Sequence, residues 1–531
     1  MTQLRNFQLP GRSPLRVTEA AVATSHPLAS ATACRILKSG GNAVDAAVAA
    51  AAVLAVVEPQ STGIGGDGFM LYAPGGTDQV IGFNGSGRAP AKAQLSWFQS
   101  RGIVEIGGHS PHAVTIPGII DMWCRVLADH GTRELGALLE DAIAYALNGY
   151  VIADRVAFDW HAAAQTIAHD DNTARVFLPG GKLPQAGDIH RQPRLAATLQ
   201  TIAQKGRDGF YEGALAADMV QHLGSLGGLH TLEDFAAARG EYVTPISTTY
   251  RGHALHQIPP NNQGVTALMM MNMLEGFEMQ GLKPLSPERL HLEIEAGRLA
   301  YHIRDQWIAD PVQAEVKTET MLSKEFATSL RQRISPHQAA TDISVPDLHK
   351  SDTVYLTVVD RDLNAVSFIN SIYHSFGSGI MSPQTGALLQ NRGMSFRIDP
   401  GHPNAIAPGK RPLHTIMPGM VTRQGKCLMP YGVMGGDYQP FGHVHLLQNV
   451  LDFGMNPQAA LDSPRVYASG ATVEVEQGIA AETRTRLTAL GHKLVDAPEP
   501  LGGGQAIVLD HARGTLTAGS DPRKDGCALG Y

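Results

Sequence analysis

The sequence lacks the features that mark several large classes of protein. Only 17% of its 531 residues are charged, the net charge is −7, and no run of basic residues occurs. Nucleic-acid-binding proteins carry a basic patch, so the composition argues against a nucleic-acid partner. With 43% hydrophobic residues and 57 glycines, the chain also lacks the low hydrophobicity of disordered proteins, and a compact, turn-rich fold is expected.

Cysteine is scarce. The four cysteines, Cys34, Cys124, Cys427 and Cys527, lie far apart and show no paired metal-ligand spacing. They are too few to stabilise a chain of this length by disulfides, which favours a reducing compartment. Residues 1–14 contain no apolar core of signal-peptide length, so we expect no export and a cytoplasmic location.

A long apolar run, Ala43–Val57, is too short for a membrane span. It has 15 residues, contains Asp45 and is followed by Glu58 and Pro59. A transmembrane helix needs about 20 apolar residues. We therefore expect a buried helix of a globular protein, and no membrane partner.

The remaining pattern is mixed. Residues 15–24 predict a strand, whereas residues 27–38, 265–277 and 287–308 predict helices. The polar segment 318–350, with its scattered prolines, is typical of a linker.

Two runs of β-branched and aromatic residues, 353–359 and 365–371, flank a short turn rich in Asp and Asn, as in a β-hairpin. If Val359 and Ala365 close the loop, continued pairing places Ser371 opposite Thr353, with Cβ atoms about 5 Å apart. A threonine at the beginning of a strand can act as an N-terminal nucleophile once the preceding peptide bond is cut. Its free α-amino group then serves as the base for its own hydroxyl. Threonine is also common in strands, so the hairpin alone leaves an ordinary structural role open.

The segment 63–68, Gly-Ile-Gly-Gly-Asp-Gly, matches the glycine pattern of dinucleotide-binding folds. That pattern requires a strand before it and a helix after it. Here the order is reversed, because the Ala-rich helix precedes the glycines and a β-type run, 69–72, follows them. We therefore expect these glycines to permit close backbone approach or positive φ angles beside a site.

Two further motifs suggest sites. His443 and His445 are two residues apart, so on a helix their rings point about 200° apart, and we expect no metal site there. Gly435 and Gly436 follow a β-type run at 428–431. Such a pair is common in turns, but its two N–H groups would also suit an oxyanion hole.

A series of short motifs runs along almost the entire chain. The N-terminal part comprises residues 40–49, 57–59 and 61–70, which include the glycine-rich segment. The others follow in order at residues 116–118, 209–211, 227–228, 245–246, 250–252, 259–260, 310–311, 364–367, 376–379, 410–412, 435–436, 464–465 and 520–523. Chance matches would not keep this order and spacing, and the set resembles the γ-glutamyltranspeptidase family.

The resemblance implies a fold and a processing step. The fold class would be α/β (α+β), a four-layer αββα sandwich of the N-terminal nucleophile hydrolase type. The chain would be an inactive precursor that cuts itself between Asp352 and Thr353. The resulting large chain, 1–352, and small chain, 353–531, would form a heterodimer and one catalytic body, with no metal and no organic cofactor.

The resemblance also implies catalytic residues. Thr353 matches the family's nucleophile, and Ser371 stands where the family usually has a second threonine that supports it. Gly435 and Gly436 match the pair that forms the oxyanion hole.

Positions that bind the γ-glutamyl group in this family are changed. Family members have an Asn, a Gln, an Asp and two Ser where this chain has Tyr373, Arg392, Ser395, His414 and Thr415, respectively. The carboxylate that binds the substrate ammonium group is therefore lost, and several of the replacements are larger.

The family's arginine that clamps the substrate α-carboxylate is also absent. Ser86 stands at its position, and Arg88 lies two residues further on, directly before Ala89. Either Arg88 or Arg392 is a candidate for carboxylate binding, because a guanidinium pairs with a carboxylate through two hydrogen bonds. A purely structural role for Arg88 is equally open.

These substitutions favour a small amide substrate with a carboxylate and no α-amino group. We expect Thr353 to attack the amide carbonyl, its own α-amine to move the proton, and water to release the acyl-threonine. This pattern resembles the oxamate amidohydrolase branch, which converts oxamate to oxalate and ammonia in purine and ureide breakdown. Three alternatives stay open: a γ-glutamyltransferase or glutathione hydrolase, a glutaryl-type cephalosporin acylase, and an inactive binding protein of the same fold.

Overall fold

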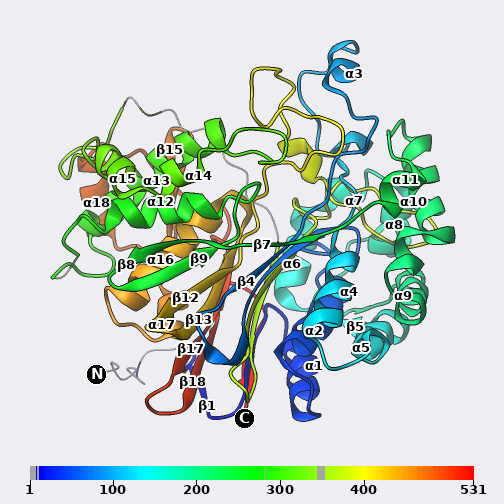
Figure 1. Cartoon of the computed structure of the whole chain (residues 1–531), viewed down its shortest axis with the longest axis horizontal. Helices are drawn as coiled ribbons and strands as arrows, with labels where there is room; N and C mark the ends of the chain where they lie inside the picture. The colour runs from blue at the N-terminus through cyan, green and yellow to red at the C-terminus, as the bar shows by residue number, and fades with distance from the viewer. Residues whose placement is uncertain (1–7, 9–10, 280, 342, 344–352) are drawn as a thin grey trace.

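The computed structural model describes residues 8, 11–279, 281–341, 343 and 353–531. Two seven-stranded antiparallel sheets lie at the centre, and helices cover the outer face of each sheet (Figure 1). The predicted four-layer αββα sandwich is therefore confirmed. Within the described residues, no helix combines the length and apolar character needed to cross a membrane.

Each sheet combines strands from both ends of the chain. Sheet I has the order β19 (Ala528–Gly530), β2 (Ala21–Ala23), β10 (Val354–Val359), β11 (Ala365–Ser371), β3 (Asp67–Ala73), β4 (Ile81–Gly85) and β7 (Glu241–Val243). Sheet II has the order β1 (Leu15–Val17), β18 (Thr515–Ser520), β17 (Gly503–Asp510), β13 (Lys426–Met434), β12 (Gly419–Arg423), β9 (His253–Gln257) and β8 (Ile246–Tyr250). Residues before and after position 353 are thus interleaved in both sheets.

The Ala-rich helix α2 (Ala43–Val57) packs directly on sheet I. All of its residues are buried, and it contacts β10 and β11. Asn42 caps its first turn, because the side-chain oxygen accepts hydrogen bonds from the N–H groups of Val44 and Asp45. This confirms the predicted buried helix. The neighbouring helices on this face are α1 (Pro27–Lys38), α4 (Ile119–His130), α5 (Leu135–Asn148) and α9 (Pro193–Tyr211).

The outer face of sheet II is covered by α12 (Gly264–Leu274), α13 (Pro287–Trp307) and α16 (Gln439–Leu451). Between the two sheets lies a separate apolar layer, to which Phe69, Tyr355 and Ile369 contribute from sheet I and Met420, Met434 and Ile507 from sheet II. The Tyr355 ring fits against the backbone of Gly432, where a Cβ atom would come within 2.4 Å of the ring.

The predicted hairpin register is confirmed. Strands β10 and β11 pair antiparallel from Val354 opposite Asn370 to Val359 opposite Ala365. β11 also pairs with β3, which places Ser371 opposite Asp67. The end of sheet I therefore brings Thr353, Ser371 and Asp67 into one row across three adjacent strands.

Two expectations for secondary structure are wrong. Residues 15–24 do not form one strand, because the chain bends after β1 and crosses to sheet I as β2. The polar segment that begins at residue 318 is helical in its first part, as α14 (Thr318–Leu322) and α15 (Lys324–Arg331). Ser323 caps α15 and buried apolar side chains hold both helices, whereas residues 342 and 344–350 lie outside the described part of the chain.

The capping of α2 gives a test of the fold. Asn42→Ala removes the acceptor for two N–H groups at the start of a fully buried helix, so the free energy of unfolding should fall by about 1–2 kcal/mol. Urea titration followed by circular dichroism measures this change. Asn42→Ser is the matched control, because serine can also cap the helix and should retain most of the stability. Equal stability of the alanine and serine variants would contradict this role.

Candidate active site

The hydroxyl groups of Thr353 and Ser371 face each other, as the hairpin register predicts. Thr353 is fully buried and precedes β10, and its Oγ1 donates to Ser371 Oγ at 3.2 Å. Ser371 Oγ also accepts from the backbone N–H of Tyr373 at 2.8 Å. Asp352, the residue before the predicted cleavage point, lies outside the described residues.

Asp67 lies next to this pair and was not among the predicted site residues. Its buried carboxylate accepts three hydrogen bonds of 2.9–3.1 Å, from the N–H groups of Gly87 and Gly118 and from the side chain of Gln390. These three donors satisfy Oδ1 of the buried carboxylate. The sequence signal for Asp67 was its position inside the glycine-rich segment 63–68.

Those glycines permit close approach of the backbone. A Cβ atom at Gly65 would lie 2.3 Å from the carbonyl oxygen of Leu388, and one at Gly66 would lie 2.3 Å from that of Ser371. The expectation of close approach is therefore confirmed. The alternative of positive φ angles is wrong for this segment, because none of its glycines has one.

His414 contacts Asp67 from the opposite side. Its Nε2 lies 3.2 Å from Asp67 Oδ2, and its ring meets Phe69 edge-on. Burial, reinforced by the positive charge of Arg392, lowers the pKa of His414 to about 3. The ring is therefore neutral at physiological pH and donates its Nε2–H to the carboxylate.

Arg392 is a buried cation that has no carboxylate partner among the residues that the structure describes. It lies in the short 3₁₀ helix η4 (Arg392–Ser395), its Nη1 donates to Thr415 Oγ1 at 2.8 Å, and its guanidinium lies 3.8 Å from the centre of the Tyr373 ring. Nε and Nη2 have no hydrogen-bond partner among the residues that the structure describes. Burial lowers the pKa of Arg392 to about 10 and raises that of Tyr373 to about 12, so the arginine stays charged and the tyrosine neutral at pH 7.

Gly435 and Gly436 form a sharp turn directly after β13. Their φ angles, 125° and 60°, fall in the region that favours glycine. Gln263, which precedes α12, donates from Nε2 both to the carbonyl oxygen of Gly436, at 3.2 Å, and to that of Thr415, at 2.6 Å. Gln263 therefore connects the glycine turn to the residue that binds Arg392.

These contacts form one continuous path. It runs from Thr353 through Ser371, Tyr373, Arg392, Thr415 and Gln263 to Gly436. The predicted nucleophile, the predicted oxyanion pair and most of the predicted substrate-binding residues are thus brought together. Ser395 shares the η4 turn with Arg392, and His414 joins through Asp67.

Arg88 lies in a different cluster. Its guanidinium is 3.6 Å from Asp310 and 3.9 Å from Glu241, and it donates to the carbonyl oxygen of Gly409. It lines a cavity of about 360 Å³ together with Ser86, and none of the other predicted site residues lines that cavity.

One group of side chains has the composition of a metal site. Ligand atoms of His291, Glu295 and His492 lie within 4.8 Å of one another in the described part of the chain. Glu295 already pairs with Arg298, and His291 is hydrogen-bonded to His492 at 2.7 Å, so a cation would displace existing contacts.

His443 and His445, which share α16, have different partners: Gln257 contacts His443, and Glu293 and Ser463 contact His445.

Comparison with known proteins agrees with this geometry. A sequence profile described as gamma-glutamyltranspeptidase matches residues 29–531. The chain is 38% identical to a glutathione hydrolase-like YwrD proenzyme of Bacillus subtilis, covering 97% of this chain and 98% of that protein. It is 35% identical to an oxamate amidohydrolase proenzyme of Klebsiella pneumoniae, covering 95% and 97%, respectively.

A solved structure is similar over the whole chain. The crystal structure of a cephalosporin acylase from Bacillus halodurans superimposes with a TM-score of 0.93 at 39% identity, covering 100% of this chain and 99% of that one. The chain therefore belongs to the γ-glutamyltranspeptidase family, and it is an N-terminal nucleophile hydrolase that acts on amide bonds.

Proposed function

We propose that the chain is a self-cleaving amidohydrolase of small carboxylate-bearing amides and that its substrate is oxamate. The observation that carries this proposal is the buried guanidinium of Arg392, which has two nitrogen atoms without partners among the described residues. A buried charge is costly unless it is paired. A substrate carboxylate that binds there would supply the missing acceptors through charge-assisted hydrogen bonds.

Processing would make the nucleophile. Thr353 Oγ attacks the carbonyl carbon of Asp352, the peptide C–N bond breaks, and an ester forms between the two residues. Water then hydrolyses the ester, which leaves a carboxylate on Asp352 and a free α-amino group on Thr353. The hydrogen bond from Thr353 to Ser371 holds the hydroxyl in a defined orientation for this attack.

Turnover would use the same hydroxyl. The freed α-amino group takes the proton from Thr353 Oγ as the oxygen attacks the amide carbon of oxamate. The N–H groups of Gly435 and Gly436 stabilise the negative charge on the carbonyl oxygen. The α-amino group passes its proton to the departing ammonia, and water attacks the oxalyl-threonine ester to release oxalate.

The charge around the site opposes a γ-glutamyl substrate. Such a substrate carries an ammonium group, whereas the position of the carboxylate that would bind it is occupied by Ser395 and the neighbouring Arg392 is positively charged. An ammonium group near Arg392 would experience like-charge repulsion in a buried, weakly screened environment. Oxamate has no ammonium group, and its carboxylate is bonded directly to the reacting carbon.

A glutaryl-type acylase is the second candidate. The similarity to the cephalosporin acylase at 39% identity favours it, because a glutaryl group also has a terminal carboxylate and no α-amine. The two substrates differ in length: three methylene groups separate the carboxylate from the amide in a glutaryl compound, and none in oxamate. Arg392 is linked to Thr353 only through Tyr373 and Ser371, so the comparison of oxamate with a glutaryl substrate decides between the two lengths.

Self-cleavage gives the first test of this proposal. On a denaturing gel the purified protein should separate into chains of 352 and 179 residues, and the small chain should begin with Thr353 by N-terminal sequencing. Thr353→Ala should remain whole, because it lacks the attacking hydroxyl. Ser371→Ala should slow cleavage, whereas Ser371→Thr keeps a hydroxyl and should cleave normally. Cleavage of the Thr353→Ala variant would reject the nucleophile.

Substrate choice gives the second test. Ammonia release is measured with oxamate and with glutamine, and aniline release with γ-glutamyl and glutaryl anilides. The highest kcat/KM should occur with oxamate. A preference for the glutaryl anilide would support the acylase, and a preference for the γ-glutamyl anilide would reject the carboxylate-only pocket.

Two arginine variants identify the carboxylate-binding residue. Loss of hydrogen bonds to a charged group costs about 1.5–3 kcal/mol, so Arg392→Met should raise the KM for oxamate about 10- to 100-fold. The fold should persist, because this arginine has no carboxylate partner among the described residues that would be left buried and unpaired. Arg88→Met is the comparison and should change KM by less than about twofold. The reverse result would assign the substrate carboxylate to Arg88.

A further inference from the structure

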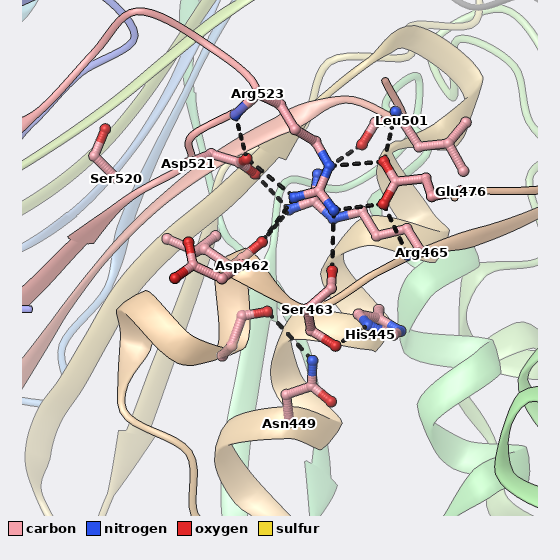
Figure 2. Close-up of polar contacts among 12 residues, drawn as sticks. His445, Asn449, Asp462, Ser463, Arg465, Glu476, Leu501, Ser520, Asp521 and Arg523 are labelled. Carbon is pink, nitrogen blue, oxygen red and sulfur yellow. Dashed lines mark hydrogen bonds and ion pairs between the residues drawn. The ribbon is translucent and has the colours of Figure 1, made fainter. Parts of the chain in front are cut away.

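Four charged side chains, from the segments next to β14 (Val466–Ser469), β15 (Thr472–Val475) and the C-terminal end of β18, form a compact cluster. Arg465 and Asp521 are buried and pair at 2.5 Å, and Arg523 pairs with both Asp521 and Glu476 (Figure 2). Arg465 precedes β14, and Glu476 follows β15. Two guanidinium groups and two carboxylates balance each other in charge.

The cluster holds the backbone of Leu501 from two sides. Glu476 Oε1 accepts from the N–H of Leu501 at 3.0 Å, and Arg465 Nη1 donates to its carbonyl oxygen at 2.6 Å (Figure 2). The Leu501 side chain is itself fully buried. The position of the next residue, Gly502, is therefore fixed by charge-assisted hydrogen bonds.

Gly502 packs against the glycine turn of the site. A Cβ atom at Gly502 would lie 2.3 Å from the carbonyl oxygen of Met434, and one at Gly435 would lie 3.0 Å from the Cα of Gly502. The carbonyl of Met434 and the N–H of Gly435 belong to one planar trans peptide unit and point in opposite directions. Because the carbonyl faces Gly502, the N–H of Gly435 points to the other side.

We propose that the cluster of Arg465, Glu476, Asp521 and Arg523 positions the oxyanion hole by holding Gly502 behind the Met434–Gly435 peptide. This inference rests on the proposed role of Gly435 as an oxyanion donor. An oxyanion donor must lie about 2.7–3.1 Å from the developing charge, so a small rotation of this peptide weakens catalysis. Arg465 is then a positioning residue, which touches no substrate.

Buried ion pairs are a poor source of stability, because the desolvation of the charges offsets their attraction. They do fix geometry, since each charged group accepts or donates several directional hydrogen bonds. Arg465 makes such bonds to Leu461, Leu501 and Asp521. The cluster is therefore better suited to holding the backbone of Leu501 in a fixed position than to raising the stability of the fold.

Gly502→Ala tests the inference against a matched control, Gly514→Ala. The two glycines have similar φ angles, 70° at Gly502 and 63° at Gly514, so an alanine adds similar backbone strain at each position. At Gly502 the added methyl group meets the carbonyl of Met434, whereas at Gly514 no atom of the described residues lies within 4 Å of it. Gly502→Ala should lower kcat about 100-fold, the effect of losing one oxyanion donor, with little change in KM. Gly514→Ala should keep the kcat of the wild type.

The assay uses processed enzyme and whichever of the four substrates named above the wild type hydrolyses fastest. Arg465→Lys, which retains the charge but not the two-pronged geometry, should lower kcat about 10-fold with an unchanged KM. Equal kcat values for Gly502→Ala and Gly514→Ala would overturn the inference. The variant Gly435→Ala distinguishes failure of the oxyanion role from failure of the positioning role. If Gly435→Ala is fully active, Gly435 is not an oxyanion donor. If Gly435→Ala is inactive while Gly502→Ala is fully active, only the positioning by Gly502 is rejected.

Discussion

The buried carboxylate of Asp67 is the contact on which the arrangement of the site depends. It lies on β3 opposite Ser371, and it receives hydrogen bonds from segments at residues 87, 118, 390 and 414. A buried carboxylate is stable only when its oxygen atoms are fully satisfied. Each of these segments must therefore reach Asp67, and this fixes where the loop that carries Arg392 lies relative to the end of the Thr353 hairpin.

The carboxylate of Asp67 also helps to explain why Arg392 can stay charged although it is buried. Arg392 has no ion-pair partner among the described residues, but the negative charges of Asp67 and Asp437 partly oppose the effect of its burial on the pKa. Asp437 is itself paired with Arg304 at 2.5 Å. The site therefore keeps a positive charge whose Nε and Nη2 donors have no partner in the described part of the chain, and a ligand carboxylate would supply the acceptors.

A helix and a strand register that depend on residues close together in the chain could be predicted from the sequence. The Ala-rich helix and the hairpin register follow from apolar runs, caps and turn residues that are close together in the chain. The fold followed from motifs that keep their order over the entire length. The separate placement of β1 and β2 in two sheets could not be read in this way, because nothing local distinguishes a continuous strand from one that crosses between sheets.

The sequence did not predict the site residues that connect segments far apart in the chain. Asp67 and Gln263 were not predicted as site residues, although each connects two parts of the site. Their partners lie more than 150 residues away, at Gln390 and Thr415. Arg88 lies apart from the other candidates: its spacing relative to the family motif made it a candidate for carboxylate binding, and its side chain contacts Asp310 and Glu241 in another cluster.

Glycines at the site allow close contacts between backbone segments as well as turns. Gly65 and Gly66 let β11 and the segment before Arg392 approach β3, and Gly502 lets a loop reach the Met434–Gly435 peptide. At each of these positions a methyl group would come within 2.3 Å of a backbone carbonyl oxygen. Directly packed backbones leave little freedom for the peptide groups that they contact. The glycines that make the loops compact are therefore also what keeps the proposed nucleophile and oxyanion donor in a constant relation to each other.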